Sequence, residues 1–284
     1  MLLFKKTNPL RLFLNDLRKQ RKPVAFIPTM GALHEGHLQL VRQAAATNAV
    51  TICSIFVNPT QFNDPTDLEK YPRTPHKDIE LLTKVGCDTL FMPAVDEIYP
   101  IGQNAWHPID FKGLDQVMEG AFRPGHFKGV AQVVERLLQL VQPDALYMGQ
   151  KDFQQTIIVR ELLQQRKLPV QLVVCPTVRE ANGLAMSSRN ARLSPKQRKE
   201  AGIIYETLQQ AKKMAEQQQP VPMIKDFALR QLLLPGWRPE YFEIVDRNTL
   251  MPLTNLNGRQ RAIACTAVWS GQIRLIDNIL IPDE

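Results

Sequence analysis

The sequence predicts an α/β protein: a parallel sheet with helices on both faces, followed by a smaller α+β part with a short antiparallel sheet. In the first 176 residues, short apolar runs alternate with helix-like segments, a pattern typical of parallel sheets. After about residue 180 the pattern changes to helices followed by three strand-like runs. We therefore expect two domains, residues 1–176 and 177–284.

The strands of the first domain are expected where apolar, β-branched runs end in turns: Val24–Pro28, Val50–Val57, Thr89–Met92, Ala145–Met148 and Val170–Cys175. Helices are expected between them: His37–Thr47, Asp78–Val85, Phe127–Val141 and Gln154–Gln165. In the third of these helices, apolar residues recur at helical spacing, which predicts one buried face. Ligands of such sheets bind beyond the carboxyl ends of the strands, so the turns after strands are the candidate functional segments.

The second domain is expected to begin with a helix whose N-cap is Ser194 and whose first residue is Pro195. We expect this helix to run to about Gln217, where a glutamine-rich polar connection begins. One further helix and three strands are expected after it: Met223–Leu234, then Tyr241–Val245, Arg261–Val268 and Ile273–Ile281.

The composition indicates a protein with a large apolar core that neither spans a membrane nor is secreted. Its 284 residues are 44% apolar, enough to bury a sizeable core. No apolar run approaches the roughly 20 residues that a membrane span requires. The apolar stretch at the N-terminus is short and interrupted by charges, unlike a signal peptide. We therefore expect a cytoplasmic protein.

The cysteines and the charge exclude two further classes. Four cysteines lie far apart without a C-x-x-C pair, which indicates reduced core residues and no structural zinc: Cys53, Cys87, Cys175 and Cys265. The net charge is +7, but lysines and arginines are spread along the chain and form no long basic run. An anionic small molecule is therefore favoured as partner over nucleic acid, and no membrane partner is expected.

The segment PTMGALHEGH, residues 28–37, follows a predicted strand and opens a predicted helix. Backbone N–H groups and the helix dipole receive phosphate at such a place, and Gly31 and Gly36 permit a tight turn. The segment lacks the lysine and hydroxyl of a P-loop and is not G-x-G-x-x-G. His34 and His37 can donate protons to phosphate oxygens. A metal pair is the alternative, but no third ligand stands at a suitable spacing.

A second polar segment, MSSRN at residues 186–190, follows the last strand of the first part. It offers two hydroxyls, an amide and the guanidinium of Arg189, which can bind phosphate oxygens in bidentate fashion. Alone, it could equally be an ordinary polar loop. An early H-x-G-H turn with a late basic loop resembles the signature pair of class I aminoacyl-tRNA synthetases, enzymes that act on the α-phosphate of ATP.

Three further segments carry polar groups at the ends of predicted elements. In GQKDFQQ, residues 149–155, Lys151 supplies a positive charge, and Asp152 can cap a helix or bind magnesium or a ribose. NPTQF at 58–62 and RPGHF at 123–127 are either structural turns or parts of a small-substrate pocket.

Together these segments resemble the pantoate–β-alanine ligase (pantothenate synthetase) family of H-x-G-H nucleotidyltransferases. The match rests on six strings in the family's order: PTMGALHEGH, SIFVNPTQF, DLEKYPRT, EGAFRPGHFKGV, GQKDFQQ and GLAMSSRN. The resemblance implies a Rossmann-like domain, a smaller C-terminal lid domain and a homodimer. Two positions depart from the family pattern: Asn182 stands where aspartate is common, and Arg192 where tyrosine is common.

The resemblance implies a two-step ligase reaction that uses ATP with Mg²⁺. Pantoate's carboxylate attacks the α-phosphorus of ATP to give pantoyl adenylate and pyrophosphate, and β-alanine then displaces AMP to give pantothenate. The alternatives are another adenylyl- or cytidylyltransferase of the superfamily, or an RNA-binding protein related to the synthetases. The pair Gln61 and Gln155 and the RPGHF segment favour the ligase.

The resemblance also implies a role for each motif residue, although it names no metal ligand. The implied catalytic residues are His34, His37, Lys151 and Arg189, with His37 as proton donor. The implied ATP-binding residues are Met30, Gly31, Ala32, Leu33, His34, Glu35, Gly36, His37, Gly149, Gln150, Lys151, Asp152, Val178, Met186, Ser187, Ser188 and Arg189. The residues implied to hold pantoate and β-alanine are Gln61, Gln155, Asn58 and His126.

Overall fold

The computed structural model describes residues 1–62, 65–100, 106–256 and 261–281. The chain forms two compact units. The first comprises Met1–Gly149 and Gln155–Pro176, and the second Gln150–Gln154 and Thr177–Glu284. The segment Gln150–Gln154 thus belongs to the second unit, although the sequence on either side of it belongs to the first.

The first unit contains a six-stranded sheet in the order β1-β4-β3-β2-β5-β6, and every neighbouring pair is parallel. Its strands are β1 Leu2–Phe4, β2 Val24–Thr29, β3 Val50–Ile55, β4 Thr89–Phe91, β5 Ala145–Gly149 and β6 Gln171–Cys175. The predicted parallel α/β class is confirmed. The strand β1 was not predicted, because a three-residue run is too short to show a periodic pattern.

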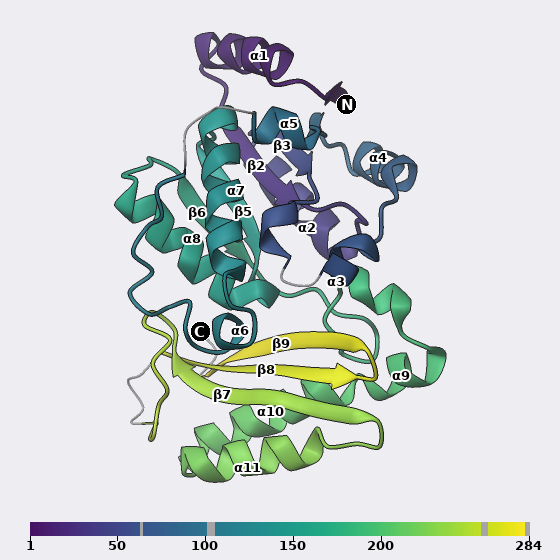
Figure 1. Ribbon diagram of the computed structural model, residues 1–284, viewed down its shortest axis with the longest axis vertical. Coiled ribbons are helices and arrows are strands. Elements are labelled where there is room, and N and C mark those ends of the chain that lie inside the picture. Colours follow the sequence, from purple (N-terminus) through teal and green to yellow (C-terminus); the bar gives the residue numbers. More distant parts are fainter. Residues whose placement is uncertain (63–64, 101–105, 257–260, 282–284) are drawn as a thin grey trace. The chain divides into compact units, whose positions relative to one another are not determined.

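Helices cover both faces of this sheet (Figure 1). Successive residues of β2 lie in different hydrophobic cores. Phe26 shares a core with residues of α1, α7 and α8, whereas Ile27 shares another with residues of α2 and α4. The helices of the first part of the chain are α1 Thr7–Lys19, α2 Glu35–Ala45, α3 Pro65–Glu69, α4 Pro75–Lys84, α5 Val95–Ile98, α6 Glu119–Phe122, α7 His126–Val141 and α8 Phe153–Gln165. Two 3₁₀ turns accompany them, η1 Pro59–Gln61 and η2 Gln150–Asp152.

The helix α1 was also missed, although its signal is present in the sequence. Leu10, Leu14 and Leu17 are buried at helical spacing and pack in the same core as α7. Glu97 tethers the start of α1, because its carboxylate accepts from the Thr7 backbone N–H at 2.8 Å and pairs with Lys6 at 2.9 Å. These bonds lower the pKa of Glu97 below its ordinary value, the Thr7 N–H contributing most.

The second unit contains the antiparallel sheet β7-β8-β9, with α10 and α11 packed in its core (Figure 1). Its elements are η3 Ser188–Arg192, α9 Pro195–Glu200, α10 Ile203–Glu216, α11 Val221–Gln231, β7 Trp237–Asp246, β8 Ala262–Ser270 and β9 Ile273–Ile281. The prediction of one helix from Pro195 to about Gln217 was wrong, since the helix is interrupted between α9 and α10. Gly202 lies at the break, and glycine is about 1 kcal/mol less favourable than alanine inside a helix.

In the part of the chain that the structure describes, no helix is long and apolar enough to cross a membrane. All four cysteines are buried thiols, as the sequence predicts.

Candidate active site

The strand order of the parallel sheet reverses between β2 and β5. These two strands are neighbours, with Ala25 opposite Ala145 and Phe26 opposite Leu146, whereas β3 and β6 lie on their outer sides. Ligands of open α/β sheets bind beyond the carboxyl ends of the strands at such a reversal. Met30 follows β2 and Gly149 ends β5, so two of the predicted ATP-binding segments begin there.

A buried carboxylate fixes the turn after β2. The Asp78 side chain, 1% exposed, accepts from the backbone N–H of Ala32 at 2.9 Å and of Leu33 at 2.8 Å. Gly31 has φ +81°, and a Cβ there would lie 2.9 Å from Cγ2 of Ile55. The sequence analysis did not assign Asp78 to the site. Its signal was a carboxylate one turn before the apolar Leu82, on the buried face of a helix.

The two histidines of the turn lie side by side at the start of α2. His34 is the N-cap residue in extended conformation, and the helix begins two residues earlier than predicted. The ring centroids of His34 and His37 are 4.0 Å apart, and Nδ1 of His37 lies 3.4 Å from the backbone N of His34. Both imidazoles are half-buried at the positive end of a helix dipole, a place that favours an anion.

Asn58, predicted to bind substrate, makes its hydrogen bonds inside the protein. Its side chain is 1% exposed. The amide nitrogen donates to the carbonyl of Gly129 at 3.1 Å and to Oε1 of Gln61 at 3.2 Å. The amide oxygen accepts from Tyr99 at 3.0 Å and from the hydroxyl of Thr60 at 3.1 Å. Asn58 therefore shapes the turn that carries Gln61.

This network determines which way the Gln61 amide points. The Gly129 carbonyl can only accept, so the group of Asn58 that faces it, and also faces Gln61, is the NH₂. Oε1 of Gln61 therefore points to Asn58, and its NH₂ faces Sδ of Met30 at 3.0 Å. Gln61 thus presents a hydrogen-bond donor toward the turn after β2.

His126, the first residue of α7, supports the same turn. It is 6% exposed, its Nδ1 lies 2.8 Å from the Gln61 carbonyl, and its Nε2 lies 3.1 Å from Nη1 of Arg123. A guanidinium only donates, so Nε2 accepts and Nδ1 carries the proton donated to Gln61. The predicted substrate residue Gln155 is half-buried in the first turn of α8.

The remaining predicted residues lie in the second unit. Lys151 in η2 has a side chain that is 19% exposed, with Nζ 3.7 Å from Oδ1 of its neighbour Asp152. Val178 and the segment 186–189 are half-buried, and Met186 donates its N–H to the Val178 carbonyl at 2.9 Å. Ser187 caps η3 by accepting from the N–H of Arg189 at 3.2 Å.

The departure at Asn182 has a structural reason. Its Oδ1 accepts from the N–H of Leu184 at 3.2 Å, and its Nδ2 donates to the carbonyl of Arg198 at 2.7 Å. Aspartate could keep only the first of these bonds. Asn190 holds the next stretch of the loop through Glu180 at 2.9 Å and the Ala185 carbonyl at 3.0 Å.

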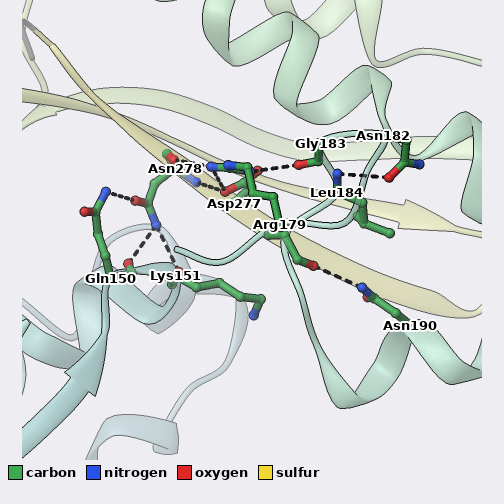
Figure 2. Close-up of polar contacts among 10 residues, drawn as sticks. Gln150, Lys151, Arg179, Asn182, Gly183, Leu184, Asn190, Asp277 and Asn278 are labelled. Atoms are coloured by element: carbon green, nitrogen blue, oxygen red, sulfur yellow. Dashed lines mark hydrogen bonds and ion pairs between the residues drawn. The ribbon is translucent and has the colours of Figure 1, made fainter. Parts of the chain in front are cut away.

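A buried polar cluster on β9 was missed by the sequence analysis (Figure 2). Arg179 and Asp277 form a two-bond ion pair of 2.5 and 3.1 Å, and Asn278 beside them bonds to Gln150 and Lys151. Burial raises the pKa of Asp277 above its ordinary value, and the Arg179 guanidinium opposes that shift. The signal was a polar Asp-Asn pair flanked on both sides by apolar strand residues.

The parallel sheet, the paired histidines at its reversal point and the smaller antiparallel unit define an α/β enzyme with an H-x-G-H turn. The family model described as pantoate-β-alanine ligase matches residues 2–280. The chain therefore belongs to the pantoate–β-alanine ligase family, as the resemblance of its motifs predicts.

Relatives match this chain along its whole length. It is 46% identical over 281 residues to the pantothenate synthetase of Azobacteroides pseudotrichonymphae, covering 98% of this chain and 99% of the relative. A crystal structure of pantothenate synthetase from Thermus thermophilus has a TM-score of 0.92 at 41% identity, covering 99% of both chains. A pantoate-β-alanine ligase from Francisella tularensis, complexed with β-γ ATP and β-alanine, has a TM-score of 0.82 at 34% identity, covering 100% of this chain and 99% of the other.

Proposed function

We propose that this protein condenses pantoate with β-alanine in a reaction that consumes ATP, through a pantoyl-adenylate intermediate. The family match over residues 2–280 and the ligands of the Francisella relative support the substrates. The observation that carries the chemistry is the pair His34 and His37 at the start of α2, beyond β2 at the reversal point.

In the first step, a carboxylate oxygen of pantoate bonds to the α-phosphorus of ATP, and the bond from that phosphorus to pyrophosphate breaks. In the second step, the amine of β-alanine bonds to the acyl carbon, loses a proton, and AMP leaves with the electrons of the carbon–oxygen bond. Adenylation is needed because a free carboxylate is a poor acyl donor. The protein contributes positioning and stabilisation of charge at phosphorus.

For ATP, we propose contacts from the motif segments that the resemblance names. The half-buried imidazoles of His34 and His37 and the N–H groups of the first turn of α2 face phosphate oxygens, and His37 donates a proton as pyrophosphate leaves. Lys151 and Arg189 contribute positive charge, and Arg189 suits bidentate binding. The full proposed ATP set is Met30–His37, Gly149–Asp152, Val178 and Met186–Arg189.

For pantoate, we propose that Gln61 and Gln155 make the direct contacts. The geometry sharpens the roles of their neighbours, because Asn58 and His126 are buried and bond to Gln61 itself. We therefore assign Asn58 and His126 to positioning. Gln61 presents its NH₂ group, which suits an acceptor such as the carboxylate or a hydroxyl oxygen of pantoate.

Magnesium enters this proposal as part of the substrate Mg–ATP. Among the residues that the structure describes, no group of three or more His, Cys, Asp or Glu side chains could hold a metal ion. Mg²⁺ typically binds substrate phosphates and water with only one or two carboxylates. The homodimer stays a prediction.

The test is the formation of AMP from ATP, pantoate and β-alanine. We expect AMP only when all three are present. AMP release without dependence on β-alanine, or a product that retains the nucleotide, would contradict the ligase and favour another nucleotidyltransferase.

Single-turnover adenylation tests the roles of His37 and Lys151. We expect His37→Ala and Lys151→Ala to slow adenylate formation about 10²- to 10³-fold, as for other lost contacts to a developing charge. Matched controls are the exposed His76→Ala and Lys196→Ala, which remove the same groups elsewhere and should leave the rate unchanged. Wild-type rates in the first two variants would refute their roles.

A further inference from the structure

The middle of β9 carries two buried polar residues among apolar neighbours. Asp277 and Asn278 are 3% and 2% exposed, and the other residues of the strand from Leu275 to Ile281 are apolar. A buried polar group is costly unless it is bonded, so the bonds that these two residues make indicate what the pair does.

The side-chain amide of Asn278 hydrogen-bonds to the turn that carries Lys151 (Figure 2). Nδ2 donates to the carbonyl of Gln150 at 3.0 Å and to that of Lys151 at 2.9 Å. Oδ1 accepts from Nε2 of Gln150 at 3.1 Å. Backbone carbonyls only accept, so the orientation of the amide is unambiguous and both of its N–H groups are used.

Asn278 is itself held by the ion pair beside it. Its backbone N–H donates to Oδ1 of Asp277 at 2.8 Å, and Nη2 of Arg179 lies 3.4 Å from its carbonyl. Arg179 also donates to the Gly183 carbonyl at 3.0 Å and stacks over the ring of Tyr205 at 3.7 Å. The loop that leads to residues 186–189 and the turn with Lys151 therefore share one anchor.

We infer that Asn278 is a positioning residue for Lys151, acting through the backbone carbonyls of Gln150 and Lys151. This inference rests on the proposed role of Lys151 at an ATP phosphate. The ammonium stands at the end of a flexible four-carbon stem, so the turn beneath it must be fixed if the charge is to be preorganised. A displacement of about 1 Å in such a group can cost on the order of 100-fold in rate.

The test is a double-mutant cycle between Asn278 and Lys151, read as kcat/KM for ATP in the adenylation step. We expect Asn278→Ala to lower it about 10- to 100-fold in the wild-type background. In the Lys151→Ala background the same change should have less than about a 2-fold effect, because the group that it positions is already gone. Asn278→Ser goes through the same cycle if Asn278→Ala yields no folded protein.

Glu240→Gln is the matched control for damage to the sheet. Glu240 on β7 has a side chain that is 10% exposed, and it bonds to Arg274 on β9 at 2.5 Å and to Trp269 on β8 at 2.9 Å. Its loss perturbs the same three strands away from the turn. We expect it to lower the melting temperature while leaving kcat/KM for ATP unchanged.

Two outcomes would overturn the positioning role while leaving the proposed function intact: equal losses from Asn278→Ala in both backgrounds, or losses no larger than those of Glu240→Gln. A wild-type adenylation rate in Lys151→Ala alone would instead remove the role of Lys151, and the inference with it. That result comes from the single variant, so the two failures are distinguishable.

Discussion

The orientation of one amide decides what the candidate pantoate site can recognise. Asn58 is fixed by the Gly129 carbonyl, and it in turn fixes Gln61. A buried amide with an unambiguous partner has only one satisfactory orientation, because its two ends are a donor and an acceptor. Gln61 therefore offers an N–H, which suits an anionic or hydroxylated substrate.

Gln61→Glu tests this assignment with little change in shape. The carboxylate still accepts from Asn58, but it replaces the NH₂ near Met30 with a negative oxygen. We expect KM for pantoate to rise at least about 100-fold, because a donor is lost and two like charges meet.

The control is Gln164→Glu, which adds the same charge on the exposed side of α8 and should leave KM unchanged. Steady-state kinetics with pantoate varied measures both variants. An unchanged KM in Gln61→Glu would show that Gln61 does not face the substrate.

At the scale of elements, the packing of α7 against η1 determines where Gln61 lies. Gly129 of α7 faces that turn, and a Cβ there would lie 2.3 Å from the Thr60 carbonyl oxygen and 2.7 Å from Cα of Gln61. These are backbone atoms of a turn and cannot move aside cheaply. The same helix contributes His126, so α7 supports Gln61 at two points.

Gly129→Ala should therefore reduce both stability and substrate binding. We expect the free energy of unfolding to fall by about 1–3 kcal/mol, as for other overpacked sites, and KM for pantoate to rise. Urea unfolding and steady-state kinetics measure the two effects. Gly149→Ala is the control for unfolding alone, because a Cβ there meets nothing within 4 Å. Equal stability of the two variants would contradict the close packing of α7.

For the whole molecule, burial of the thiols links stability to alkaline pH. Burial raises the pKa of Cys175 from 9.0 to about 11, raises that of Cys87, and raises that of Cys53 well above its ordinary value. Above about pH 9 the unfolded chain therefore loses thiol protons that the folded protein retains. Ionisation then favours the unfolded state, so stability falls as pH rises from 9 toward 11.

The native protein should therefore resist thiol reagents at pH 8 and react fully once unfolded. Cys175→Ala should also reduce the loss of stability between pH 8 and pH 10.5, by an amount of order 2 kcal/mol. Urea unfolding at the two pH values measures this difference. Rapid labelling of native thiols, or the same pH dependence in both proteins, would contradict the burial.

The sequence by itself determined the parallel α/β class, most strands, the buried thiols and the segments that identify the family. It could do so because apolar periodicity and turn composition are local properties of the chain, and the motif strings are contiguous. The missed features were local too: β1 is too short to show a period, the helical spacing of the leucines in α1 was overlooked, and Gly202 was not read as a helix break.

Only the tertiary structure decided which residues hold the motif residues in position. Asn58 and His126 hold Gln61, Asp78 holds the turn before α2, and Asn278 holds the backbone of Lys151 from more than a hundred residues away. The physical reason is that the direction of an amide or carboxylate is set by partners distant in sequence. A spacing pattern shows that polar groups gather, whereas burial and hydrogen bonding decide which of them remain available to a ligand.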